Sequence, residues 1–257
     1  MEIIGIAGTK QAGKDSAAKL ITGIVMQRMK LINNYDMTAD GHLIVYYQEE
    51  GKNRGTIQEA NGIFDLDRRD EVMVNWLSET VWPHVKIYHF ADSLKFILAN
   101  MFNLDLDMLF GDTSKKESPS PIKWERMVDV IPKKKLKKNI NLNDFMTYRE
   151  VMQYFSDILR NIDDDCFTRY CVDDVNRNQV PISIVGDVRR EEEVDAIKAA
   201  GGKIIYLTRH LNDDTHHMEN GLKNVDRSKF DIVIDNQNMS MGEKNVRLVN
   251  ELKNIGF

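Results

Sequence analysis

A glycine-bounded loop near the N-terminus limits the folds open to this chain of 257 residues. A short apolar run leads into Gly8, and the segment Gly13-Lys14-Asp15-Ser16 follows and opens a helical pattern. Glycines allow the backbone to wrap tightly, so that successive N–H groups converge on an anion beside the positive end of the helix. The strand–loop–helix context favours a phosphate-binding loop over the alternative, a chance glycine turn in which Lys14 is an ordinary surface lysine.

Such a loop predicts ATP and Mg²⁺ as ligands. Lys14 can reach the β- and γ-phosphates as a mobile point charge. The motif usually places Ser or Thr directly after this lysine, but Asp15 intervenes here. Ser16 is therefore the predicted metal ligand, and Asp15 is expected to help position water or metal. The predicted nucleotide-binding residues of the loop are Gly8, Lys10, Ala12, Gly13, Lys14, Asp15 and Ser16.

The loop alone does not separate kinases from GTPases. A GTPase needs an Asn-Lys-x-Asp segment that selects guanine, and the sequence has none. The nearest fragment, Glu243-Lys244-Asn245, lacks the aspartate and follows no predicted strand. The sequence therefore favours a kinase.

Buried-strand patterns alternate with helical patterns along the chain. Strands are expected at residues 2–7, 85–90, 181–186, 203–208 and 231–235. Helices are expected at 13–30, after 92, and at 148–162, 190–200 and 241–255. This alternation predicts one α/β domain over residues 1–257, with a five-stranded, mainly parallel sheet and helices on both faces.

Two segments interrupt the alternation. Residues 41–66 read as a β-hairpin with a glycine turn. Residues 103–145 are polar and weakly periodic, which predicts a mobile or locally folded insertion. The basic run at 133–138 within it is expected to be a solvated loop; contact with phosphates or a nucleic acid is the alternative.

Composition indicates which classes of partner the protein is expected to bind. The net charge of −5 gives no global field for nucleic acid, so small-molecule nucleotides are the expected partners. No apolar run is long enough to span a membrane, no basic leader is present, and Cys166 and Cys171 resemble buried thiols. These features predict a cytoplasmic protein, and they leave open whether it forms a homodimer.

Several motifs together resemble the deoxynucleoside monophosphate kinases of tailed bacteriophages. The segments that carry the resemblance are Gly8…Gly13-Lys14-Asp15-Ser16, Phe90-Ala91-Asp92-Ser93-Leu94-Lys95, Arg149-x-x-x-Gln153, Asp187-Val188-Arg189 and His217-Met218-Glu219. The resemblance spans nearly the whole chain except the two insertions. It implies transfer of a phosphoryl group from ATP to a deoxynucleoside monophosphate.

Candidate acceptor residues lie in the second half of the chain. Arg149 and Gln153 are one helical turn apart and face the same side, so Arg149 is expected to grip the acceptor phosphate and Gln153 the base or sugar. A polar, solvent-facing stripe is the alternative. Asp187 follows a buried strand and so should lie at the ligand edge of the sheet, where it is expected to orient Mg²⁺ through water or to bind the sugar hydroxyl of the substrate. Arg189 is expected to bridge acceptor phosphate and transferring phosphoryl, and Glu193 to contact the substrate. The alternative is that Asp187 is an N-capping aspartate, followed by ordinary charged helix residues.

The resemblance implies further site residues. Phe90 and Lys95 would begin the acceptor-binding arm, although a strand-end Phe is equally good core. Residues from about 209 to 225 would form a lid over ATP, in which Arg209 stabilises charge on the transferring phosphoryl. Asn236 follows the last strand and is predicted to touch adenine, although Asn is also a common turn residue.

Two rival functions remain open at the level of sequence. Parts of the pattern also occur in phosphomevalonate kinases of the animal type and in dephospho-coenzyme A kinases. A nucleotide-binding module without catalysis, which would use the basic run for nucleic acid, is the rival from another class. The presence of Lys14 and of the acceptor-side residues disfavours that second rival.

Overall fold

The computed structural model describes residues 1–9, 11–50, 57–66, 68, 70–131, 140–209, 222 and 225–257. The chain divides into two compact units. The first unit comprises Met1–Leu66, Val72–His89 and Val172–Phe257, and the second comprises Asp67–Glu71 and Phe90–Cys171.

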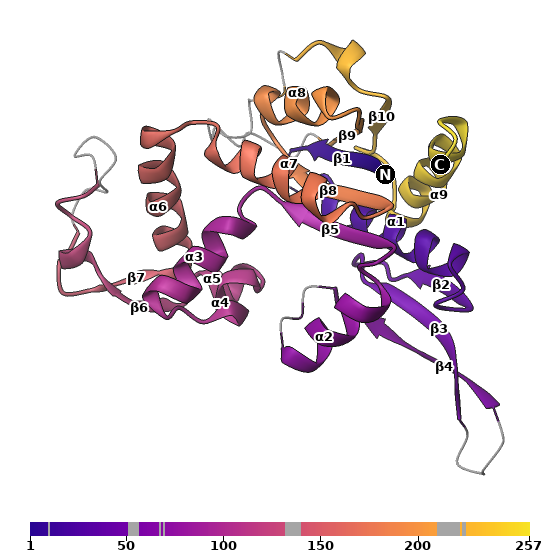
Figure 1. The fold of residues 1–257 in the computed structure, drawn as a ribbon, viewed down its shortest axis with the longest axis horizontal. Coiled ribbons are helices and arrows are strands. Elements are labelled where there is room, and N and C mark those ends of the chain that lie inside the picture. The colour runs from indigo at the N-terminus through magenta and orange to yellow at the C-terminus, as the bar shows by residue number, and fades with distance from the viewer. Residues whose placement is uncertain are drawn as a thin grey trace. The chain divides into compact units, whose positions relative to one another are not determined.

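A five-stranded parallel sheet forms the centre of the first unit (Figure 1). Its strands are β1 (Glu2–Gly8), β5 (Val85–His89), β8 (Ile182–Val188), β9 (Lys203–Thr208) and β10 (Ile232–Asp235). They lie in the order β10-β9-β1-β8-β5, so β1 is central and the chain crosses from the β8 side of it to the β9 side. The predicted fold class and all five predicted strands are confirmed.

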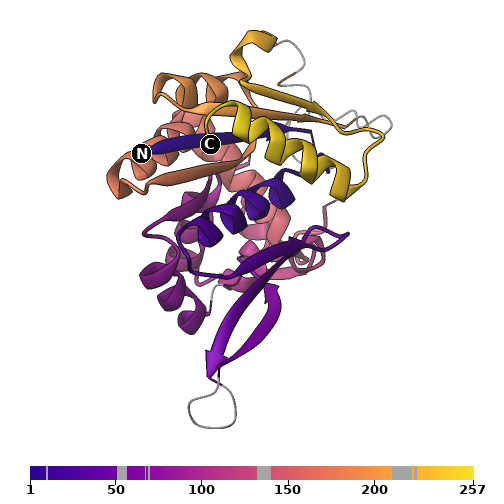
Figure 2. The same cartoon turned by 90° about the vertical axis from the view of Figure 1, so that its right-hand side faces the viewer.

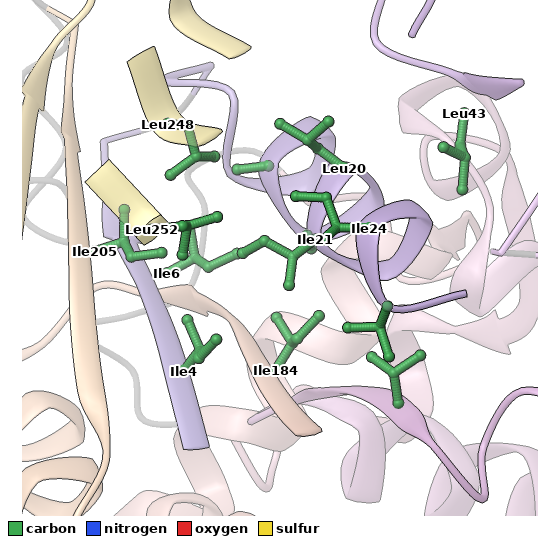
Figure 3. Packing of buried hydrophobic residues seen from close by; sticks show 14 of the residues in the cluster. Ile4, Ile6, Leu20, Ile21, Ile24, Leu43, Ile184, Ile205, Leu248 and Leu252 are labelled. Atoms are coloured by element: carbon green, nitrogen blue, oxygen red, sulfur yellow. The ribbon is translucent and has the colours of Figure 1, made fainter. Parts of the chain in front are cut away.

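Helices cover both faces of this sheet because its side chains alternate along each strand. Ile4 and Ile6 of β1 are fully buried in a cluster that includes side chains of α1 (Lys14–Arg28) and α9 (Met241–Asn254). Between them, Gly5 faces Ile197 of α8 (Glu191–Ala199), which contacts β1 and β9. Figure 3 shows the cluster that contains Ile4 and Ile6, and Figure 2 shows α9 next to α1.

An antiparallel sheet of β2 (Asn34–Met37), β3 (Leu43–Glu50) and β4 (Ile57–Phe64) packs on α1 through Leu43. The hairpin predicted within residues 41–66 is the β3–β4 pair, and β2 adds a strand that the sequence does not predict. The helix α2 (Glu71–Thr80) follows β4. A short 3₁₀ helix, η4 (Arg227–Lys229), precedes β10.

The second unit is built mainly from helices. Its elements are α3 (Asp92–Phe102), α4 (Leu106–Phe110), α5 (Thr113–Lys116), β6 (Pro119–Lys123), the 3₁₀ helix η1 (Trp124–Arg126), β7 (Phe145–Thr147) and α6 (Tyr148–Ile162). The helix α7 (Cys166–Asn178) begins in this unit. The described part of segment 103–145 is therefore locally folded, whereas the basic run lies outside the described residues.

Edge-on aromatic pairs hold the second unit together. The Phe102 ring of α3 lies 4.8 Å from that of Phe155 on α6, and the Trp124 ring lies 5.4 Å from that of Tyr154. Thr147 starts α6 with a capping box, in which it and Glu150 satisfy each other's backbone N–H groups. None of the helices in the described part of the chain is long and apolar enough to cross a bilayer.

Candidate active site

Two glycines shape the loop that joins β1 to α1. Gly8 has φ of 155°, and a Cβ there would lie 2.5 Å from the carbonyl oxygen of Leu207 on β9. Gly13 has φ of 86° and stands at the N-cap of α1, where it offers no side chain to the helix N–H groups. The positive end of α1 is thus left available to an anion, which is the arrangement that the sequence predicts.

Lys14 lies folded over this loop. Its Nζ donates hydrogen bonds to the carbonyl oxygens of Gly8 (3.0 Å) and Thr9 (2.8 Å), and it lies 3.2 Å from Oδ1 of Asp187. Burial lowers the pKa of Lys14 below its ordinary value; the charge of Asp187 opposes this shift and that of Arg189 adds to it. The loop carbonyls and Asp187 thus hold the lysine over the loop.

An irregularity in β8 places Asp187. From Gly5 to Ala7, β1 advances by two residues, while β8 advances from Val185 to Val188, which inserts one extra residue in β8. Asp187 lies in this bulge with φ of 64°, a left-handed conformation that aspartate tolerates better than most side chains. The bulge brings the carboxylate to the edge of the sheet where β1 enters the glycine loop.

Arg189 shares the carboxylate with Lys14. Its Nε donates to Oδ1 of Asp187 at 2.7 Å. Burial raises the pKa of Asp187, but the charges of Arg189 and Lys14 outweigh it and hold the pKa below the usual aspartate range. Lys14 and Arg189 therefore share one oxygen of this carboxylate, which holds two cationic side chains beside the glycine loop. The structure brings together Lys14, Asp187 and Arg189, as the sequence predicts.

Glu193 has a structural task in the same region. It is buried, and its Oε2 accepts hydrogen bonds from the backbone N–H groups of Arg189 (2.7 Å) and Arg190 (3.2 Å). This cap fixes the start of α8 and the backbone that carries the Arg189 guanidinium. The N-cap of α8 is Arg190 and not Asp187, so the predicted capping aspartate is wrong. Contact of Glu193 with substrate stays a prediction.

The hydroxyl of Ser16 is held from two sides. It donates to the carbonyl oxygen of Gly13 (2.9 Å) and accepts from Nζ of Lys244 (2.7 Å). Lys244 comes from α9, and burial lowers its pKa to about 8. Gly41, at the base of the predicted hairpin insertion, also packs against Ser16, because a Cβ there would lie 3.0 Å from Cβ of Ser16. Sequence reasoning missed both Lys244 and Gly41.

Arg209 and Asn236 directly follow the neighbouring strands β9 and β10, and both contact the glycine loop. Asn236 is buried, and its Nδ2 donates to the carbonyl oxygen of Ala12 at 2.9 Å. The hydroxyl of Thr9 donates to the backbone carbonyl of Arg209 at 3.0 Å. Contact of Asn236 with adenine and action of the Arg209 guanidinium on the phosphoryl group stay predictions. Lys10 and most of the predicted lid lie outside the described residues.

The predicted acceptor residues of the second unit lie on α3 and α6. Arg149 pairs through Nε with Glu117, and Gln153 is exposed one turn further along α6. Lys95 donates to Oδ1 of Asp92 at 2.9 Å. Phe90 is buried and is therefore a core residue, and its contact with nucleotide stays a prediction.

The donor set around the loop fits Mg²⁺ only as a partly hydrated ion. Among the described residues no group of three or more acidic, His or Cys side chains forms a metal cluster. Ser16 keeps one lone pair beyond its two hydrogen bonds, and Asp15 is exposed beside it. Since Mg²⁺ usually keeps several waters and takes its other ligands from one or two side chains and phosphates, these residues suit it.

This fold and loop define a class. A parallel sheet whose central strand runs into a glycine–lysine loop, with a carboxylate on the adjacent strand and an arginine directly after that strand, is the framework of a P-loop nucleotide kinase. A family profile described as deoxynucleotide monophosphate kinase matches residues 2–243. The chain belongs to the deoxynucleotide monophosphate kinase family.

Two viral proteins are similar to this chain. The deoxynucleotide monophosphate kinase of Enterobacteria phage T4 is 25% identical over 268 residues, which cover 98% of this chain and 99% of the phage protein. A putative deoxynucleotide monophosphate kinase of Acanthamoeba polyphaga mimivirus is 28% identical over 153 residues, or 57% of this chain and 72% of the viral protein. The family resemblance stated from the motifs is thereby confirmed.

Proposed function

We propose that this chain transfers the γ-phosphoryl group of ATP to deoxynucleoside monophosphates, with Mg²⁺ as cofactor, in the cytoplasm of a virus-infected host cell. The observation that carries the proposal is the bridge from Lys14 in the glycine loop to Asp187 on the adjacent strand. Phosphoryl transfer depends mainly on positioning and on charge neutralisation, and these residues supply both.

In this mechanism the loop and the N-terminus of α1 bind the donor phosphates. Lys14 exchanges its loop carbonyls for phosphate oxygens, which are stronger acceptors because they are charged. Arg189, held by Asp187, neutralises charge that develops on the transferring group. When bound, Mg²⁺ would supply Lewis-acid charge on the donor phosphates, and Ser16 and Asp15 are the residues proposed to hold it.

Arg149 and Gln153 are proposed to bind the acceptor. The guanidinium of Arg149 already pairs with the carboxylate of Glu117, and the oxygens of an acceptor phosphate are anionic acceptors of the same kind. Phe90 and Lys95 are proposed to support this site, and Glu193 is proposed to contact the substrate. Arg209 and Asn236 are proposed to act on the donor side, on the phosphoryl group and on adenine respectively.

A panel of acceptors tests the proposal. Release of ADP would be measured with the four common deoxynucleoside monophosphates, their ribose counterparts, dephospho-coenzyme A and phosphomevalonate. At least one deoxynucleotide should turn over at roughly 1–100 s⁻¹, the range usual for kinases. Turnover of dephospho-coenzyme A alone, or of phosphomevalonate alone, would instead support the corresponding rival. Binding of ATP without turnover of any acceptor would favour the non-catalytic module.

Replacing Arg149 with lysine should weaken the acceptor site. A point charge cannot reproduce a bidentate fork, so kcat/KM for the acceptor should fall by about 2 kcal/mol, or roughly 30-fold. The KM for ATP should change far less, because the glycine loop binds the donor. Arg177→Lys, on the exposed side of α7, is the matched control. If the KM for ATP rises while that for the acceptor holds, Arg149 belongs to the donor side.

A further inference from the structure

Lys244 is a buried lysine on the packing face of α9. It precedes Leu248 by one helical turn, and Leu248 precedes Leu252 by another, so all three share one side of the helix. Figure 3 shows Leu248 and Leu252 directed into the cluster that contains Leu20 and Ile21 of α1. Lys244 is only 2% exposed, although a lysine on a helix surface normally extends its charge into water.

The ammonium group of Lys244 has neutral neighbours. Its Nζ lies 2.7 Å from Oγ of Ser16 and 3.5 Å from the carbonyl oxygen of Gly13. The space for it exists because Gly13 has no side chain: a Cβ there would lie 3.3 Å from this Nζ. Within the described ranges, no carboxylate forms an ion pair with Lys244.

The buried charge of Lys244 lowers the stability of the folded protein. An ammonium removed from water without an anion destabilises a protein, and an apolar side chain of similar volume would pack with Leu248 at lower cost. The positive end of α1 lies beside it and adds repulsion. An anion bound at the start of α1 would remove both penalties, and the phosphates of a nucleotide are the anion that this loop is shaped to bind.

We propose that Lys244 is a positioning residue of the donor-phosphate site, which orients the Ser16 hydroxyl and fixes the start of α1. The hydroxyl proton of Ser16 points to Gly13, and one of its lone pairs accepts from Lys244. Its remaining lone pair is thereby given one direction, toward the nucleotide side. The inference rests on the proposed function only in that the donor is a nucleotide with phosphates.

The test compares Lys244→Met with Lys253→Met, an exposed lysine of the same helix. Affinity for ADP with Mg²⁺ and for adenosine would be measured by titration calorimetry, and thermal unfolding would be followed without ligand. Lys244→Met should weaken ADP by about tenfold or more, which is the usual effect of losing a charged hydrogen bond. Adenosine affinity should stay within about twofold, and Tm should not fall, because a buried unpaired charge is removed. Lys253→Met should change none of these values.

Ser16→Ala provides the second arm. If Lys244 acts through Ser16, this variant loses ADP affinity to a similar degree, and adding Lys244→Met costs less than about threefold more. Additive losses, an equal loss of adenosine affinity, or a Lys244→Met protein that unfolds would each overturn the inference. These are equilibrium measurements without an acceptor, so their outcome is separate from whether the wild-type protein phosphorylates deoxynucleotides.

Discussion

Replacing Lys14 with alanine should lower kcat by at least about 100-fold at saturating ATP and acceptor. This lysine is a mobile point charge that can follow the phosphoryl group during transfer, and removal of a major transition-state charge contact has effects of this size. Its hydrogen bonds to Gly8 and Thr9 are available for exchange, because both acceptors are neutral carbonyls that a phosphate outcompetes. Steady-state turnover and a single-turnover measurement would both report the loss.

The same variant must be shown to fold. Lys14→Ala leaves two loop carbonyls without their lysine donor, which costs about 1–3 kcal/mol for each of them, and it leaves the core beneath α1 intact. Circular dichroism and thermal unfolding would check this point. Lys19→Ala, at a half-buried position of the same helix, is the matched control and should keep near-normal turnover. Near-normal turnover of Lys14→Ala would refute the assignment of the loop as the donor site.

The central sheet could be predicted because its signals are local. Each strand is a short apolar run covered on both faces, and such runs need no knowledge of their neighbours to be recognised. The helix predicted at about 148–162 is confirmed as α6, because apolar residues recur at helical spacing along it. By contrast, β2 (Asn34–Met37) alternates exposed and half-buried residues and gains its stability from pairing with β3, which the sequence does not display.

The residues that complete the site depend on contacts across the chain. Lys244 occupies a helix position that reads as one charge among several, and only the packing of α9 against α1 reveals that it reaches Ser16. Gly41 reads as a turn glycine of an insertion, yet it packs on the same serine. The motif that contains Asp187 was recognisable, but the bulge that turns this carboxylate toward Lys14 depends on the register between β1 and β8.

Replacement of Asp187 is the second change that we expect to have a large effect on turnover. Asp187→Asn should lower kcat by about 100-fold, because the carboxylate holds both Lys14 and Arg189 and each charged hydrogen bond is worth roughly 1.5–3 kcal/mol. Asparagine tolerates the left-handed backbone at this position and keeps an oxygen acceptor, so the variant removes the charge without straining the bulge. The ratio of wild-type to variant kcat should not change with pH from about pH 5 to neutral pH. The neighbouring cations hold the pKa of the wild-type carboxyl below its usual range, so this group stays ionised there.

Asp235→Asn is the matched control for this charge. Asp235 also ends a strand of the same sheet, but it is exposed and accepts from the backbone N–H of Gln237 (3.1 Å), so its neutral variant should retain turnover within about threefold. Both variants would be assayed for kcat and for the KM of ATP and acceptor across the pH range. If the carboxylate positions the two cations for transfer, the Asp187 variant loses kcat while its KM for ATP changes little. If ATP instead binds more tightly and kcat holds, Asp187 merely competes with phosphate for Lys14 in the empty protein, and the proposed positioning role is wrong.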